Sequence, residues 1–153
     1  MNRAPTIQEI ITELTEIFTA ALPDAHVKDL DQVPDSATAI CPVLYPDQFT
    51  GADAATRDTF GEPPTHASTK VISIRYTLCY APVGQGTGQK VIVPLNWDMA
   101  DRVINVVMEN DKNNTLWDDL VITQFGNGFD YVSDLTGGAF YGFTFTVTIT
   151  KYL

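Results

Sequence analysis

The stretch YGFTFTVTITKYL, residues 141–153, alternates between two kinds of side chain. From residue 143 to residue 150 every second side chain is apolar, and each one between is a threonine. Successive side chains of a β-strand point to opposite faces of the sheet, so strict alternation indicates a strand with two different faces. The apolar residues, which we expect to face a core, are Phe143, Phe145, Val147 and Ile149.

The other face of this strand consists of Thr144, Thr146, Thr148 and Thr150. A row of threonines resists burial in a dry core, because each hydroxyl group would then need a hydrogen-bond partner. Such a row is also flatter and less charged than a typical solvent-exposed face. It is therefore either an ordinary solvated sheet surface, or a face or edge that meets a second copy of the chain or a tube-like partner.

An amphipathic helix is predicted near the start of the sequence. From Ile7 to Ala21 the apolar residues follow the i, i+3, i+4, i+7 spacing without a gap. Thr6 and Glu9 form a candidate capping box, and Pro23 ends the pattern. The apolar stripe of this helix needs a partner, and a sheet is the expected one.

Two strands separated by a long loop are predicted next. Residues 39–45 are a short apolar run that Pro46 closes. Residues 46–69 are rich in Pro, Gly, Asp and Thr, and we expect them to form an extended loop that projects from the core. The clearest internal strand is KVISIRYTLCYAP, residues 70–82, which again alternates between apolar and polar side chains.

A second helix and three consecutive strands complete the prediction. The helix is expected over residues 93–110, with Asn96 as its candidate cap. The segments LWDDLVITQF (116–125) and FDYVS (129–133) precede the strand quoted above, and glycines mark the turns between them. Three strands in succession indicate an antiparallel meander.

This order of elements favours an α+β fold with a mostly antiparallel sheet of four to five strands, two helices packed on one face, and long projecting loops. At 153 residues the chain is expected to form a single domain over residues 1–153. The residues expected to define its core are Ile10, Leu14, Phe18, Ile74, Tyr76, Val103, Val107, Phe143, Phe145 and Val147.

The composition is acidic, with 9 basic against 19 acidic residues and a net charge of −10. Such a chain repels nucleic acid, although its surface remains compatible with DNA that passes without binding. The sequence has no stretch long and apolar enough to suggest a membrane span or a secretory signal, so we expect a soluble protein made in a cytoplasm. Cys41 and Cys79 lie in apolar runs and are interpreted as buried free thiols.

Candidate catalytic and ligand-binding residues do not form a recognisable constellation. His26 and His66 have no metal-ligand spacing around them, and no cofactor or metal is expected. The glycine-rich segment Gly84–Lys90 lacks the Gly-Lys-Ser/Thr sequence of a phosphate-binding loop, and the strand-like VIVP follows it. Nothing isolates two carboxylates in an apolar pocket. These observations predict a protein that is not an enzyme.

The segments NWDMADRVINVVMEN (96–110), LWDDLVI (116–122) and AFYGFTFTVTIT (139–150) together resemble the C-terminal half of the tail terminator, or tail completion, proteins of long-tailed bacteriophages. In that family a helix follows the inner strand, a short strand comes next, and a final strand opens with a Tyr-Gly pair. Here that pair is Tyr141-Gly142. The upstream elements fit the same arrangement over nearly the whole chain.

The resemblance implies a structural virion protein assembled in the host cytoplasm and located in the tail or neck of the virion. Such proteins close into a ring, typically sixfold, on the end of the tail tube. They stop tube polymerisation and join the tail to a neck or head-completion protein, while DNA passes through the lumen without specific binding. The residues suspected at subunit or partner interfaces are Gly84, Gln85, Gly86, Thr87, Gly88, Gln89, Thr144, Thr146, Thr148 and Thr150.

Other functions remain open at this point. A neck or stopper protein at the head-to-tail joint would have subunits of similar size. A small-molecule-binding α+β domain, with residues 46–69 as a lid over the concave face of the sheet, belongs to a different class. A general adaptor that forms no ring is a third alternative.

Overall fold

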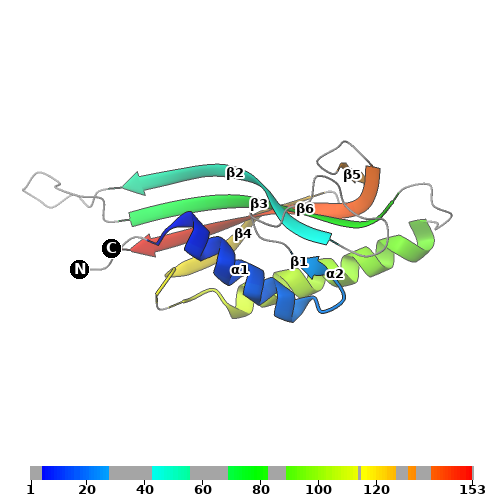
Figure 1. Cartoon of the computed structure of the whole chain (residues 1–153), viewed down its shortest axis with the longest axis horizontal. Coiled ribbons are helices and arrows are strands. Elements are labelled where there is room, and N and C mark those ends of the chain that lie inside the picture. Colours follow the sequence, from blue (N-terminus) through cyan, green and yellow to red (C-terminus); the bar gives the residue numbers. More distant parts are fainter. Residues whose placement is uncertain are drawn as a thin grey trace, which may run out of the picture.

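The computed structural model describes most of the chain as one sheet and two helices (Figure 1). The described residues are 5–27, 43–55, 69–82, 89–113, 115–126, 131–133 and 139–152. Helix α1 spans Ile7–Ala21 and helix α2 spans Gln89–Glu109. The strands are β1 (His26–Val27), β2 (Val43–Ala55), β3 (Thr69–Pro82), β4 (Asp119–Gly126), β5 (Tyr131–Ser133) and β6 (Ala139–Tyr152).

The sheet has the strand order β1-β2-β3-β6-β4, and the short β5 also pairs with β6. All pairs are antiparallel except that between β1 and β2. The predicted α+β class with a mostly antiparallel sheet is thereby confirmed. Five strands lie on the main path of the sheet, within the predicted four to five, and β5 adds a sixth among the described residues. Strands β1 and β5 are 2 and 3 residues long and too short to show a periodic pattern in the sequence.

Helix α1 begins where its capping box predicts. The main-chain N–H of Glu9 donates to Oγ1 of Thr6 over 3.1 Å, and the N–H of Thr6 donates to Oε2 of Glu9 over 2.8 Å. Two main-chain donors that the helix itself cannot satisfy thus find partners. The helix ends at Ala21, two residues before Pro23.

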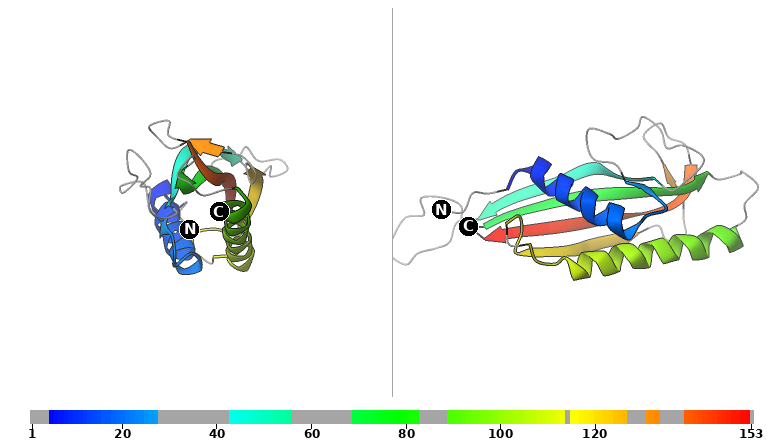
Figure 2. Two further views of the ribbon diagram at one scale, coloured as in Figure 1. Left: turned by 90° about the vertical axis from the view of Figure 1, so that its right-hand side faces the viewer. Right: turned by 60° about the horizontal axis from the view of Figure 1, so that its bottom comes forward.

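The two helices run along the sheet, and Figure 2 shows both on the same side of it. One hydrophobic cluster joins their apolar stripes to alternate residues of β3 and β6. Burial of this apolar surface is the main term that holds the layers together. All ten residues named above as core-defining belong to this cluster, together with the fully buried Trp117.

Strand β2 continues past Pro46, so the prediction of a loop over residues 46–69 is wrong for its first ten residues. The strand runs to Ala55 and pairs with β3 throughout. Strand β1 pairs only with Val43 and Leu44, which leaves Pro46 on an edge strand where a missing N–H is tolerated. Residues 56–68 of the predicted loop lie outside the described residues.

Helix α2 begins at Gln89, earlier than predicted, and includes the VIVP segment that suggested a strand. Pro94 lies inside the helix. Because proline has no main-chain N–H to donate, the helix lacks one of its i→i−4 hydrogen bonds at this residue. Asn96 is therefore not the helix cap. It is a buried residue within the helix.

The predicted strands after α2 are shorter than expected. Leu116, Trp117 and Asp118 precede β4, and Trp117 forms an isolated bridge with Asn113. The indole N–H of Trp117 donates to the main-chain oxygen of Asn110 over 2.9 Å. This contact fastens the end of α2 to the start of β4. Of the predicted 129–133 strand, only Tyr131–Ser133 is described as strand.

Bulges interrupt the pairing of the long strands. Register shifts occur between Pro46 and Gln48 and between Phe49 and Gly51 in β2, and between Ile122 and Gln124 in β4. A bulge bends its strand and increases the local twist.

None of the helices among the described residues has the length and apolar character that a membrane crossing requires.

Candidate functional site

The threonine row lies on an interior strand. Strand β6 pairs with β3 on one side and with β4 on the other, so its threonines form part of a face and not of an edge. The Thr148 hydroxyl lies 3.0 Å from the Ser73 hydroxyl and 3.1 Å from the Thr123 hydroxyl. Thr146 is only 6% exposed. The Thr148 hydroxyl is therefore satisfied within the sheet, which compensates for its partial burial.

A charged network adjoins this row on the same face. Asp47 accepts hydrogen bonds from Nε and an Nη of Arg75 at 2.9 and 2.8 Å, and from the Thr77 hydroxyl at 2.7 Å. The hydrogen bond to Asp47 raises the pKa of Arg75 above its ordinary value. Arg75 therefore stays charged at every pH at which proteins are normally handled. The bulge at Asp47 turns its side chain towards β3.

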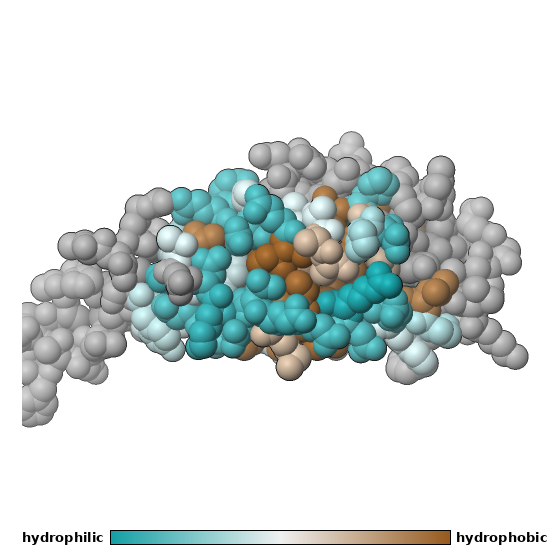
Figure 3. All heavy atoms as spheres, turned by 90° about the horizontal axis from the view of Figure 1, so that it is seen from below, coloured by the Kyte–Doolittle hydropathy of each residue, from teal (hydrophilic) through white to brown (hydrophobic). Residues whose placement is uncertain are grey.

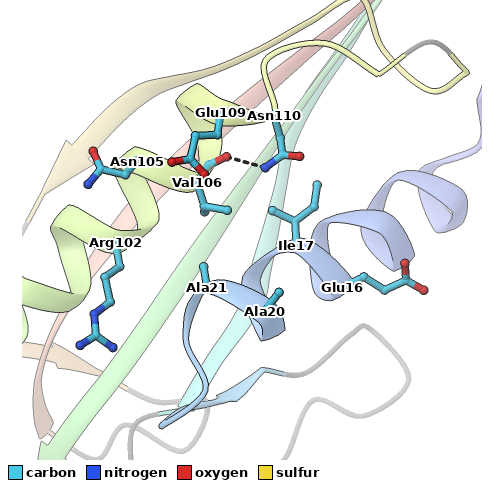
Figure 4. A pocket seen from close by; sticks show the side chains of 9 residues that line it. All are labelled: Glu16, Ile17, Ala20, Ala21, Arg102, Asn105, Val106, Glu109 and Asn110. Atoms are coloured by element: carbon cyan, nitrogen blue, oxygen red, sulfur yellow. Dashed lines mark hydrogen bonds between the residues drawn. The ribbon is translucent and has the colours of Figure 1, made fainter.

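A groove of about 590 Å³ runs between the two helices on the opposite side of the molecule. Figure 4 shows its lining, with Ile17 and Ala21 of α1 facing Val106 of α2. Hydrophobic residues gather in the middle of this face between hydrophilic bands (Figure 3). Arg102, at one end of the groove, pairs with Asp98 over 3.0 Å. The surface is a shallow apolar strip with a mixed-charge rim.

A second groove, of about 520 Å³, lies between α2 and β4. Its lining is more apolar, and its exposed side chains include Met108, Val121 and Phe125, of which Met108 is 69% exposed. Strand β4 pairs with β6 alone among the described residues, so its other edge carries unpaired main-chain groups. An unpaired strand edge beside exposed apolar side chains is typical of a surface that binds another chain.

The opposite edge of the sheet is also open. Strand β1 covers only the first two residues of β2 among the described residues. Beyond them lies Phe49, a large apolar side chain that is 49% exposed and lines a small cavity against Ile7 and Ile11 of α1. Both long edges of the sheet thus combine free main-chain groups with exposed apolar side chains.

Asn96 connects α2 to the opening of β6. Its side-chain amide nitrogen donates to the main-chain oxygen of Gly142 over 3.1 Å, and Asn96 is only 2% exposed. The other amide atom, Oδ1, has no hydrogen-bond partner among the described residues. Asn96 and Gly142 lie in segments that are far apart in the sequence, and the fold brings them into contact.

The structure places the suspected interface residues in two groups. The four threonines lie together on β6, as described above. Gly84, Gln85, Gly86, Thr87 and Gly88 lie outside the described residues, as does the side chain of Gln89, the first residue of α2. The glycine-rich segment is followed by a helix and not by a strand, which corrects one reason given against a phosphate-binding loop. The absence of the Gly-Lys-Ser/Thr sequence still stands.

The remaining candidate residues do not converge. Cys79 is a buried thiol whose Sγ lies 3.9 Å from the Tyr45 hydroxyl, whereas Cys41 and His66 lie outside the described residues. His26 is exposed on β1. Within the described ranges, no group of three or more His, Cys, Asp and Glu side chains could hold a metal ion.

Sequence reasoning missed the apolar residues at the two edges. Met108 and Ile104 lie outside the core-facing stripe of α2. An apolar residue in that position has no partner in the core of its own chain, so these two residues could have indicated a contact surface from the sequence alone. Phe49 was hidden inside a segment interpreted as a loop. A comparison with models of known protein families and with curated proteins found no match.

Proposed function

We propose that this protein is a structural, non-enzymatic subunit of a bacteriophage tail, a tail terminator that closes into a ring on the end of the tail tube. In this function it stops tube polymerisation and presents a surface to a neck or head-completion protein. The proposal rests on the sequence resemblance and on one structural observation, an open sheet in which β4 and, beyond Leu44, β2 have no outer partner strand among the described residues and carry exposed apolar side chains.

The edges support assembly because a ring needs two different complementary surfaces on each subunit. Strand β4 with α2 provides one such surface, and β2 with α1 provides the other. The two surfaces lie at opposite edges of the sheet, so successive copies can join head to tail. A protein that acts alone gains nothing from two exposed edges, which promote association.

The link between Asn96 and Gly142 joins two of the segments on which the resemblance rests. The family pattern places a helix and a Tyr-Gly pair far apart in the sequence, and here the two bonded residues are 46 positions apart. Their hydrogen bond fixes α2 against the start of β6.

The net charge of the chain restricts where its acidic groups can lie in a ring. A net charge of −10 on each copy opposes association unless the acidic groups lie on the lumen or the outer surface. A lumen of this charge would also let DNA pass without binding it.

The experiment that tests the proposal is a measurement of mass in solution combined with imaging. We expect the purified full-length chain to elute as a closed oligomer by size exclusion with light scattering, and to appear as rings by negative-stain electron microscopy. Added to growing tail tubes, it should arrest their elongation and remain at one end. A chain that is monomeric at all concentrations and leaves tube growth unchanged would contradict the proposal. The partner that co-purifies separates a tail terminator from a neck connector.

A further inference from the structure

The register of the sheet relates its two open edges to each other. Phe49 pairs with Ile74, Ile74 with Val147, and Val147 with Ile122. These four residues form one row across the sheet, and the buried ones show that the row faces the helices. Phe49 therefore ends the row at the β2 edge, and Ile122 ends it at the β4 edge.

The strand directions allow a second copy to extend the sheet. Strands β2, β3, β6 and β4 alternate in direction, so β2 and β4 are antiparallel to each other. A copy placed beside β4 by rotation about an axis along the strands brings its β2 next to β4 in antiparallel orientation. A rotation has no translation along its axis, so each row of one copy continues into the same row of the next.

The groove at the β4 edge is suited to the side chain that this rotation delivers. Ile122 lies in the lining of the groove together with Met108 and Phe125. Phe49 of the second copy would arrive at the height of Ile122 and on the same face. Leu120 and Phe125 extend the apolar lining on either side of Ile122, so a tilt that shifts the register by two residues keeps the aromatic ring in the groove.

The charges at the middle of the two edges permit this contact. The next row joins Gln48, Arg75, Thr146 and Gln124, so an uncharged glutamine would meet another uncharged glutamine. Asp47 lies two residues before Phe49 in β2, and Arg75 neutralises it through two hydrogen bonds. These two rows therefore add no like-charge repulsion to a chain whose net charge is −10, whereas a row nearer the end of the sheet would set Asp53 of one copy opposite Asp119 of the other, a repulsion that salt would screen.

We infer that the β4 edge of one copy binds the β2 edge of a second copy, with Phe49 of the second copy inserted into the groove between β4 and α2. This inference deepens the proposed function and rests on it, because the head-to-tail contact is what closes the ring. Main-chain hydrogen bonds between the two edges align the copies, and the phenylalanine anchors them.

Disulfide trapping with full-length double variants tests the contact directly. Phe49→Cys would be combined in turn with Leu120→Cys, Ile122→Cys and Phe125→Cys. Positions 49 and 122 are three strand spacings apart within one chain, about 14 Å, whereas a disulfide needs Cα atoms within about 7 Å. Any link between the two introduced thiols must therefore join two copies.

Under mild oxidation we expect at least one double variant to give a ladder of covalent oligomers on a denaturing gel. Each single variant, which has only one introduced thiol, should give no ladder beyond a dimer. An oligomer that forms but gives no ladder with any of the three positions would overturn the inference and leave the proposed ring intact. A chain that never associates would overturn both.

A substitution gives a second, non-covalent readout. Phe49→Ser should weaken association at least tenfold in sedimentation equilibrium, whereas Leu95→Ser, which removes an exposed apolar side chain of α2 outside both edges, should leave it unchanged. Circular dichroism shows whether each variant is folded. Equal association of the Phe49→Ser variant and the parent chain would contradict the anchoring role.

Discussion

The side-chain amide of Asn96 donates a hydrogen bond to the main-chain oxygen of Gly142, 3.1 Å away, and so ties helix α2 to the strand at the centre of the sheet. Both residues are buried. A polar contact that is sealed from water in this way costs more to break than an exposed one, because the group left behind has no solvent to bond with.

We predict that Asn96→Ala lowers the free energy of unfolding by about 1–3 kcal/mol. Asn96→Asp should be worse at neutral pH, because it sets a buried carboxylate against a carbonyl oxygen. Burial raises the pKa of such a carboxyl group, so its neutral form persists at low pH and can donate to Gly142. The loss in the free energy of unfolding caused by Asn96→Asp should therefore become smaller as the pH falls.

Urea denaturation at several pH values measures this effect. The exposed Asn105→Asp is the matched control, since it makes the same change in charge on the same helix. Equal destabilisation by the two aspartate variants at neutral pH would show that the contact with Gly142 contributes nothing.

We predict that Asp47→Ala destabilises the fold by about 1–3 kcal/mol, because it leaves the buried Thr77 hydroxyl without its acceptor. Arg75 is partly exposed and regains water, so it adds little to the loss. Thermal unfolding followed by circular dichroism provides the measurement. Asp24→Ala removes an exposed carboxylate 3.9 Å from Arg102 and should change stability by less than about 0.5 kcal/mol.

The arginine in this network makes no contribution to pH dependence near neutrality. Its pKa is raised in the folded state, so the stability it provides is fully present below the ordinary arginine pKa and is lost only as the pH rises through the folded value.

We predict that Thr148→Val lowers stability by about 1 kcal/mol, because the hydroxyl between Ser73 and Thr123 is removed while the shape of the side chain is kept. Thr150→Val should be close to neutral, since the Thr150 hydroxyl makes no hydrogen bond within the described part of the chain. Chemical denaturation compares the two. If both substitutions were neutral in the isolated subunit, the hydroxyl contacts on this face would not stabilise it.

We predict that Trp117→Phe destabilises the fold by about 1–2 kcal/mol through loss of the indole contact with Asn110, and Trp117→Ala by about 3–5 kcal/mol through the cavity it adds. Trp97, which is 44% exposed, provides the comparison. The Trp97→Phe variant should keep its stability and show the blue-shifted fluorescence of the buried Trp117 alone. Emission at the wavelength of exposed tryptophan from that variant would contradict the burial.

The layers of this fold could be predicted because their residues repeat with a clear period. The apolar stripes of α1 and α2 and the alternation in β3 and β6 depend only on which side of an element faces the core. The ten core residues chosen from these patterns are all buried in one cluster. Capping by Thr6 and Glu9 is equally local, since it involves residues three positions apart.

The errors occurred where a local signal competed with a partner distant in the sequence. Pro46 indicated the end of a strand, but β3 holds the main chain of β2 in place for another nine residues. Asparagine is a common helix-cap residue, but the side chain of Asn96 forms its hydrogen bond with the main-chain oxygen of Gly142. The edge residue Phe49 could not be identified, because no pattern in a sequence states which strand of a sheet lies outermost.

The bulges in β2 and β4 have a geometric consequence for assembly. A head-to-tail contact gives a closed ring only if the angle between neighbours divides a full circle, and otherwise it propagates as an open helical fibre. That angle depends on how far the sheet bends between its two borders, which the extra residues beside Gln48 and Gln124 help to determine. Deleting Thr123, the extra residue of β4, would keep the apolar side chains of the contact on the same face and yet turn a cap of fixed circumference into an endless filament.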